Sequence, residues 1–129
     1  MVETTASGPV VMVAEDDRDV RELVRHCLES DGCEVIPVGD GRETLDTLAR
    51  RSVDLLVLDL MMPRTNGVEV LKTLRERAAL DDLPVLVLSA RCREADVAFC
   101  LELGAVDYVV KPFRLQELLS QVRKLVWGS

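Results

Sequence analysis

The sequence predicts an α/β fold in which helices cover both faces of a parallel β-sheet. Short apolar runs alternate with amphipathic segments five times along the 129 residues. Most of these runs are apolar without interruption, as expected of strands that are buried on both faces. The length and the 48% hydrophobic content suit one domain with a substantial core.

The first two strand and helix pairs lie between residues 10 and 49. The β-branched run VVMVA (10–14) predicts a strand, and the segment after it repeats apolar side chains with helical spacing until Gly32. The run CEVIPV (33–38) predicts the second strand, in which Pro37 suits an edge of the sheet. The apolar faces of the helices are Val20, Leu23, Val24, Cys27 and Leu28 in the first, and Leu45, Leu48 and Ala49 in the second.

The third and fourth pairs repeat this pattern. The runs DLLVLD (54–59) and PVLVLSA (84–90) predict strands. The helix after the first of them has Val68, Leu71 and Leu74 on one face. The charged run 75–83 is interpreted as the end of that helix and a turn. The helix after the fourth strand is expected over 94–103, where Gly104 is placed to end it.

The last pair completes the predicted sheet. VDYVV (106–110) predicts the fifth strand, and six apolar residues with helical spacing follow it. They are Leu115, Leu118, Leu119, Val122, Leu125 and Val126. Five such pairs with right-handed crossovers predict a flavodoxin-like, doubly wound parallel sheet of strand order 2-1-3-4-5. In that order, ligands bind outside the carboxyl ends of strands 1 and 3.

Charge and composition argue against several classes of function. The net charge of -7 makes direct binding to nucleic acid improbable for this chain. Because it has neither a long apolar run nor a leader sequence, we expect a cytoplasmic protein without membrane contact. The first nine residues are predicted to be a flexible tail before one domain over 10–127. The scattered cysteines are expected to be reduced, namely Cys27, Cys33, Cys92 and Cys100.

Polar side chains collect where the predicted strands end. They are Glu15, Asp16 and Asp17 after the first strand, Asp59 in the third, Ser89 in the fourth and Lys111 after the fifth. Neighbouring carboxylates repel one another unless a cation lies among them, and a small set of oxygen ligands suits Mg²⁺. Alternatively, Asp17 caps the first helix and Ser89 caps the loop before the fourth. Capping does not explain Asp59 or Lys111, since each leads into a segment that contains proline.

The motifs at these strand ends resemble the receiver domain of two-component response regulators. They are EDD (15–17), LDLMMPRTNG (58–67), SA (89–90) and KPF (111–113). The resemblance extends from residue 10 to residue 126, so the predicted domain over 10–127 would be a receiver domain. Each motif is short, but the four follow one another in order at the ends of the predicted strands.

The resemblance implies a role for each residue at this edge. Asp59 corresponds to the phosphoacceptor, which receives a phosphoryl group from a phosphohistidine of a sensor kinase or phosphotransfer protein. Asp16 corresponds to a direct Mg²⁺ ligand and Glu15 to a ligand that acts through a water molecule. Asp59 and the backbone carbonyl of Met61 would complete the protein ligands, and Mn²⁺ is expected to substitute for Mg²⁺. Lys111 corresponds to the cation that pairs with the acyl phosphate.

The resemblance also implies a signalling switch. Ser89 corresponds to the hydroxyl residue that bonds a phosphoryl oxygen, and Tyr108 to an aromatic residue that turns inward when Ser89 moves. The peptide between Lys111 and Pro112 is typically cis in the family. Phosphorylation would reshape the face formed by the fourth helix, the fifth strand and the last helix, and so change binding to an effector or a second copy.

On that face the fourth predicted helix carries two apolar stripes, of which one can face the sheet. One stripe is Val97, Ala98 and Leu101, and the other is Ala95, Phe99 and Leu103. The family pattern suggests that Ala98 and Leu101 are buried and that Phe99 stays partly exposed. An exposed stripe of this kind marks a partner surface, unless Phe99 folds back over its own helix.

The predicted chemistry is that of a switch rather than a turnover enzyme. Phosphoryl transfer needs an oxygen nucleophile and positive charge around the transferred group, which Asp59, Mg²⁺ and Lys111 supply. The chain would catalyse its own phosphorylation and a slow dephosphorylation. The resemblance implies that Met61 and Arg91 occupy the positions that flank the path of the hydrolytic water. A Met side chain does not orient water by hydrogen bonding, so the phosphoryl group should persist longer than in a Met61→Asn variant.

Three other functions share parts of this pattern. A haloacid-dehalogenase-type phosphatase has a second acid two residues after the nucleophile, where this chain has Met61. A flavodoxin needs a phosphate-binding loop where this chain has carboxylates. A pseudo-receiver has the fold without phosphorylation, but none of the expected positions is missing here. His26 lies off the apolar helix face and is interpreted as a surface residue rather than a phosphotransfer site.

Overall fold

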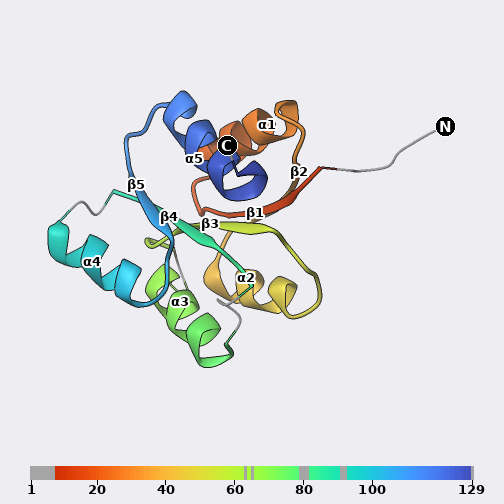
Figure 1. The fold of residues 1–129 in the computed structure, drawn as a ribbon. Helices are drawn as coiled ribbons and strands as arrows, with labels where there is room; N and C mark the ends of the chain where they lie inside the picture. Colours follow the sequence, from red (N-terminus) through yellow and green to blue (C-terminus); the bar gives the residue numbers. More distant parts are fainter. Residues whose placement is uncertain (1–7, 63, 65, 79–81, 91–92, 129) are drawn as a thin grey trace.

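Five parallel strands form one twisted sheet in the order β2-β1-β3-β4-β5, which confirms the predicted topology (Figure 1). The computed structural model describes residues 8–128 apart from 63, 65, 79–81 and 91–92. The strands are β1 (Val10–Ala14), β2 (Glu34–Val38), β3 (Leu55–Asp59), β4 (Val85–Ser89) and β5 (Asp107–Val110). β1 has the predicted bounds, and the other strands differ from the predicted runs by one residue at one end or both, as is usual where strands meet loops.

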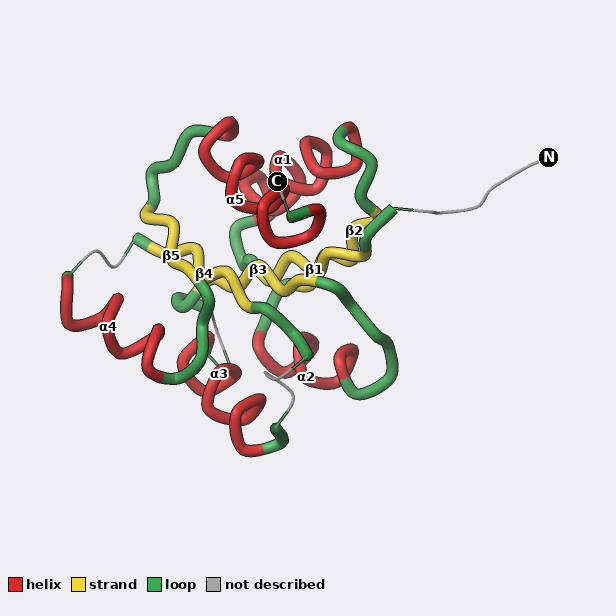
Figure 2. The backbone as a smooth tube through the Cα atoms, viewed as in Figure 1, coloured by secondary structure: helices red, strands yellow, loops and turns green. Residues whose placement is uncertain are grey.

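Helices cover both faces of this sheet. They are α1 (Arg18–Ser30), α2 (Gly41–Leu48), α3 (Gly67–Glu76), α4 (Glu94–Glu102) and α5 (Leu115–Trp127). Figures 1 and 2 show α1 and α5 on one face, and α2, α3 and α4 on the other. Each layer buries its own apolar cluster, because successive side chains of a strand point to opposite faces. Val11 and Val13 therefore pack toward α1 and α5, whereas Met12 packs toward α2 and α3.

The register of the sheet aligns the carboxyl ends of its central strands. Ala14 at the end of β1 pairs with Leu58, and Asp59 at the end of β3 pairs with Leu88. The backbone N–H of Lys111 donates to the Ser89 carbonyl at 2.9 Å, which extends this edge beyond β5. Residues from four strands or the segments after them thus meet at one edge of the molecule.

Of the described helices that begin at this edge, three have a side-chain N-cap bond and two have none. The side chains of Asp17, Asp40 and Asn66 accept hydrogen bonds from backbone N–H groups in the first turns of α1, α2 and α3. Arg93 and Arg114 occupy the corresponding positions of α4 and α5 without a side-chain cap bond. The capping alternative is therefore correct for Asp17. Arg93, not Ser89, precedes α4, and a capping role of Ser89 in the loop before this helix stays a prediction, because residues 91–92 lie outside the described residues.

The buried face of α4 differs from the prediction. Ala98 and Leu101 were expected to face the sheet, but both are exposed. Cys100 is the buried residue of this helix, so the inward direction falls between the two predicted stripes. Phe99 is 42% exposed, as predicted. The family pattern misled the assignment because α4 is apolar on several sides, and its sequence alone selects no single face.

Several smaller expectations can be compared with the structure. His26 is exposed, as predicted. Cys27, Cys33 and Cys100 are free thiols, whereas Cys92 lies outside the described residues. The predicted tail also lies largely outside them, and the division into a tail and one domain stays a prediction. No helix among the described segments has the length and apolar character that a membrane span requires.

Candidate functional site at the carboxyl edge of the sheet

Three carboxylates meet where β1 and β3 end. Glu15 and Asp59 are 1% and 2% exposed, whereas Asp16 is exposed to solvent. One carboxylate oxygen from each of the three residues lies within 4.8 Å of the others. This set of hard oxygen donors, open to solvent on the side of Asp16, fits a divalent cation such as Mg²⁺. Of the carboxylates that the sequence placed at this edge, these three come together, whereas Asp17 caps α1.

Lys111 provides positive charge beside the two buried carboxylates. It follows β5, and its peptide bond to Pro112 is cis. Its Nζ lies 2.5 Å from Glu15 Oε1 and 3.2 Å from Asp59 Oδ2. An unpaired buried carboxylate is costly, so this lysine explains how a charged side chain is tolerated at the end of a buried strand.

Both ends of the Lys111–Glu15 pair have shifted pKa values. Burial raises the pKa of Glu15 to about 7, and the neighbouring Asp59 also raises it, whereas the hydrogen bond from Lys111 acts in the opposite direction. Burial by itself would lower the pKa of Lys111, but the hydrogen bond to Glu15 and the negative charge of Asp59 outweigh it. The pKa of Lys111 is therefore raised, and the amine stays charged at neutral pH.

Both oxygens of Asp59 are held in place. Oδ1 accepts a hydrogen bond from the backbone N–H of Met61 at 2.9 Å, and Oδ2 faces Lys111. The loop after β3 closes where the Gly67 N–H donates to the Leu60 carbonyl at 3.1 Å. A Cβ at Gly67 would lie 2.5 Å from the Asp59 carbonyl oxygen, so this close approach requires glycine.

The Met61 side chain leaves this loop outward and is 52% exposed. It stands where a haloacid-dehalogenase-type phosphatase would have a second acid, and an exposed thioether supplies no proton there. Arg91, the other predicted neighbour of the water path, lies outside the described residues.

Ser89 lies on β4, which pairs with β3, and Tyr108 lies on β5, which pairs with β4. Ser89 ends β4, is fully buried and pairs with Val110 in the sheet register. Tyr108 is half-buried in β5, and its ring packs against the core cluster on the side of α3 and α4. The two residues thus occupy neighbouring strands, while their proposed motion stays a prediction.

Two arginines at this edge escaped the sequence analysis. Arg21 Nη1 donates to the Glu15 carbonyl oxygen at 2.8 Å, and Arg64 Nη1 lies 3.0 Å from Asp40 Oδ2. The position of Arg21 one turn into the first predicted helix was the available signal, because that turn lies at the carboxyl edge of the sheet. The partner of Arg64 is 24 residues away in sequence, and no local pattern indicates it.

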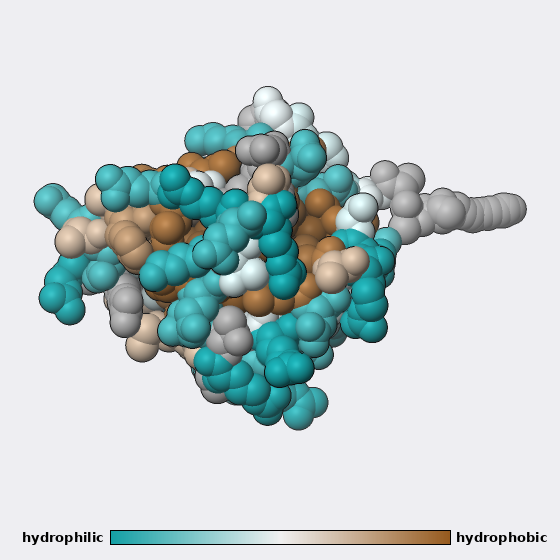
Figure 3. Space-filling view, turned by 90° about the horizontal axis from the view of Figure 1, so that it is seen from below, coloured by the Kyte–Doolittle hydropathy of each residue, from teal (hydrophilic) through white to brown (hydrophobic). Residues whose placement is uncertain are grey.

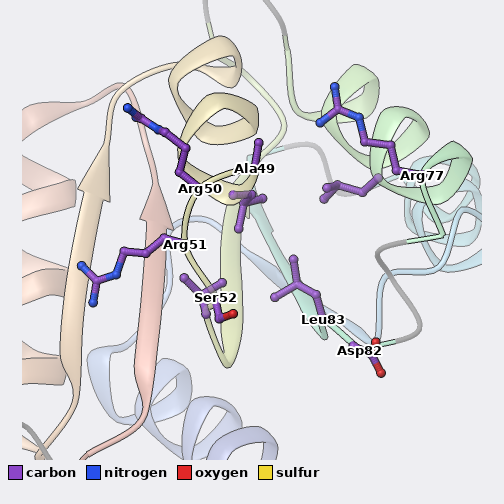
Figure 4. Close-up of a pocket in the computed structure, with 10 residues that line it drawn as sticks. Ala49, Arg50, Arg51, Ser52, Arg77, Asp82 and Leu83 are labelled. Atoms are coloured by element: carbon purple, nitrogen blue, oxygen red, sulfur yellow. The ribbon is translucent and has the colours of Figure 1, made fainter.

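Two hollows differ in their relation to the site. An apolar hollow of about 400 Å³ adjoins Lys111, and its lining is Val20, Leu23, Ala90, Lys111, Pro112, Phe113 and Leu115. A larger one, of about 650 Å³, lies away from the site, between the end of α2 and the segment before β4 (Figure 4). The side chains of Arg50 and Arg51 extend away from its centre in Figure 4, and Arg51 pairs with Glu34.

Fold and site together define a receiver-type α/β domain with an acidic cluster, a lysine and a hydroxyl residue at one edge. Residues 11–123 match the family model described as the response regulator receiver domain. The chain belongs to this family. It is 47% identical over 116 residues to the response regulator MprA of Mycolicibacterium vanbaalenii, and 46% identical to MprA of Mycobacterium leprae. The match covers 90% of this chain but about half the length of these relatives, 49% and 50%.

Solved structures agree with this assignment. The receiver domain of the Francisella response regulator 1452 has a TM-score of 0.88 at 32% identity, with 94% of this chain and 98% of that chain covered. The chemotaxis protein CheY4 of Vibrio cholerae has a TM-score of 0.85 at 28% identity, with 92% and 99% covered.

Proposed function

We propose that this chain is a phosphorylation-dependent signalling switch in which Asp59 accepts a phosphoryl group from a phosphohistidine. The observation that carries the proposal is the Asp59 carboxylate itself. It is buried at a strand end, held by Lys111 and a backbone N–H, and grouped with Glu15 and Asp16. A carboxylate fixed in this way is a nucleophile that needs little reorganisation before it attacks.

Each side chain has a separate task in this proposal. Asp16, Asp59 and the Met61 carbonyl would hold Mg²⁺, and Glu15 would act through a water molecule. When bound, the ion supplies positive charge to the oxygens of the transferred group. Lys111 pairs with a phosphoryl oxygen on the other side, and Ser89 donates its hydroxyl to another. The switch catalyses its own phosphorylation but has no repeated turnover.

The hollow beside Lys111 supports a docking surface for the phosphodonor. A phosphohistidine that reaches Asp59 brings its protein against the edge where this hollow lies. The hollow is apolar, and Leu23 on α1 is 51% exposed at its rim. Apolar residues exposed beside a reactive group suit a protein partner such as a sensor kinase or a phosphotransfer protein.

A second surface supports the output. Phe99 and Leu101 on α4, together with Val106 and Val110 around β5, are exposed although they are apolar. Figure 3 shows hydrophobic side chains between hydrophilic ones on the layer of α2, α3 and α4, including a patch toward α4. Ser89 and Tyr108 lie on the strands beneath this surface, so a movement that starts at Asp59 has a short path to it. An effector or a second copy would bind there.

Acetyl phosphate tests the function without a partner protein. With Mg²⁺, the intact protein should gain the mass of one phosphoryl group, and Asp59→Asn should gain none. Asp46→Asn is a matched control, because Asp46 is an exposed carboxylate on α2. A phosphoryl group that persists on Asp59→Asn, or that never forms on the parent, would refute the proposal.

The lifetime of the phosphoryl group gives a finer test. Met61→Asn places a hydrogen-bonding side chain at an exposed position beside Asp59, where it can orient a water molecule. We expect faster loss of the phosphoryl group than in the parent, measured after acetyl phosphate is removed in excess Mg²⁺. Slower or equal loss in the variant would show that this position does not control hydrolysis.

A further inference from the structure

We propose that Arg21 is a positioning residue for the divalent cation, because its guanidinium holds the peptide between Glu15 and Asp16 and thereby directs the Asp16 carboxylate. The inference rests on the metal site of the proposed function. Its central observation is the charge-assisted hydrogen bond from Arg21 Nη1 to the Glu15 carbonyl oxygen, 2.8 Å long. Arg21 is half-buried, so water competes less for this bond than at an exposed ion pair.

Asp16 needs such positioning more than its neighbours do. Glu15 and Asp59 are buried, and the surrounding core restricts their side chains, whereas Asp16 is exposed. The peptide bond is planar, so fixing the Glu15 carbonyl also fixes the Asp16 nitrogen and limits the direction of its side chain. On the other side, the N–H of Asp17 donates to Glu15 Oε2 at 3.1 Å. The backbone of Asp16 is thus held both before and after its α-carbon.

The surroundings of Arg21 favour this contact. The Glu15 N–H donates to the Val38 carbonyl at 3.1 Å, which ties the end of β1 to β2 and places the loop after β2 nearby. Gly39 lies in that loop, and a Cβ there would stand 3.1 Å from Arg21 Nη1. The missing side chain at Gly39 therefore leaves space for the guanidinium, and Gly39→Ala would crowd it without removing its charge.

Charge and position predict opposite effects on Mg²⁺ affinity. A positive guanidinium near the carboxylates repels a cation, so loss of charge by itself would strengthen Mg²⁺ binding. Loss of positioning would weaken it, because ligands that are held less firmly must be ordered when the ion binds. The sign of the change therefore separates the two roles of Arg21.

Arg25 provides the matched control on the same helix. It carries the same charge one turn further along α1, but its guanidinium bonds Glu22 at 2.6 Å and Glu29 at 2.9 Å rather than the β1 end. Arg25→Met removes an equal charge and leaves the Glu15 carbonyl bond intact. It should leave the Kd for Mg²⁺ unchanged or slightly lower.

Calorimetric titration of the intact protein with Mg²⁺ tests the proposal. Arg21→Met should raise the Kd about tenfold, and Gly39→Ala and Arg21→Lys should raise it by smaller factors, although both keep the charge. The metal-free variants should stay folded, as measured by circular dichroism. An unchanged or lower Kd in Arg21→Met would overturn the inference, even if its Tm fell, because the role would then be structural.

Further outcomes keep the test decisive. If Arg21→Met does not fold, the Kd values of Arg21→Lys and Gly39→Ala for Mg²⁺ are used instead. An unchanged Kd in both variants overturns the inference. If the parent binds no Mg²⁺, or Asp16→Asn binds it equally well, the metal site of the proposed function fails. If the parent binds Mg²⁺ through Asp16 and the Arg21 variants have the same Kd as the parent, then the metal site stands and only the role of Arg21 is refuted.

Discussion

Helices α1 and α4 both follow a strand at the carboxyl edge, yet they are held to the sheet in different ways. In α1, Val24 and Leu28 are fully buried, and the Asp17 side chain caps the first turn. In α4, Cys100 is the buried residue, and the Arg93 side chain makes no cap bond. The comparison shows that α1 is anchored in the core beside the site, whereas α4 leaves apolar side chains such as Phe99 and Leu101 exposed.

Both helices also contact a neighbouring helix at the surface. At the end of α1, Asp31 accepts two hydrogen bonds from the Arg123 guanidinium of α5, at 2.6 and 2.8 Å. At α4, the contacts to α3 include a bond from Arg75 to the Glu102 carbonyl at 2.7 Å and Lys72 above the Phe99 ring at 5.8 Å. Contacts of this kind are exposed to solvent and individually weak at both helices, so the contrast between α1 and α4 depends on burial.

The largest expected difference between the helices comes from truncating a leucine in each. Leu28→Ala should lower the free energy of unfolding by about 2–5 kcal/mol, because it leaves a cavity in a fully packed core. Leu101→Ala should lower it by less than about 1 kcal/mol, since this side chain is 44% exposed. Urea unfolding followed by circular dichroism measures both. Equal losses would contradict the contrast between α1 and α4.

The two helices should also separate input from output. Leu23→Lys on α1 should slow phosphoryl transfer from a sensor kinase by about tenfold, because it places a charge at the rim of an apolar hollow. It should leave phosphorylation by acetyl phosphate unchanged. Phe99→Lys on α4 should retain both reactions but lose association that depends on phosphorylation, as followed by light scattering or pull-down. Association that survives Phe99→Lys would move the output surface elsewhere, with α1 as the next candidate.

Removing the side-chain cap of α1 and adding one to α4 tests how much capping contributes to the stability of each helix. Asp17→Ala should destabilise the protein by about 1 kcal/mol, because two N–H groups in the first turn of α1 lose their acceptor. Arg93→Asp should stabilise it by up to about 1 kcal/mol through a new cap at α4. Thermal unfolding of the metal-free protein compares the two, with Asp17→Asn as the conservative control. A drop in Tm for Arg93→Asp would show that α4 does not tolerate a tighter start.

The smallest expected effect is the pH dependence of the link between α1 and α5. Hydrogen bonding to Arg123 lowers the pKa of Asp31 below its ordinary value of 3.8. A carboxyl group whose folded-state pKa is lowered adds stability above its unfolded pKa, and this stability disappears as the pH falls through the folded value. The Tm difference between the parent and Asp31→Asn should therefore be present at pH 7 and vanish at acidic pH. A difference that persists at acidic pH would point to packing instead.

Local patterns were sufficient for much of this molecule. Uninterrupted apolar runs predicted the strands and helical spacing predicted the helices, because both depend on side chains that are near one another in sequence. The (βα) alternation then predicted the sheet order through the general rules for parallel sheets with right-handed crossovers. The candidate site followed from the same logic. The ends of parallel strands meet at one edge, so Glu15, Asp16, Asp59 and Lys111 could be grouped before any distance was known.

The tertiary structure decided what depends on approach between distant segments. The inward face of α4 was assigned wrongly, because a helix that is apolar on several sides is oriented by its packing and not by its own pattern. The raised pKa of Glu15 depends on burial beside Asp59, and the bond from Arg21 depends on the space at Gly39. Sequence by itself determined which groups reach the edge of the sheet, since strand periodicity is local. Their mutual distances, burial and hydrogen bonds came from packing, which is a property of the whole fold.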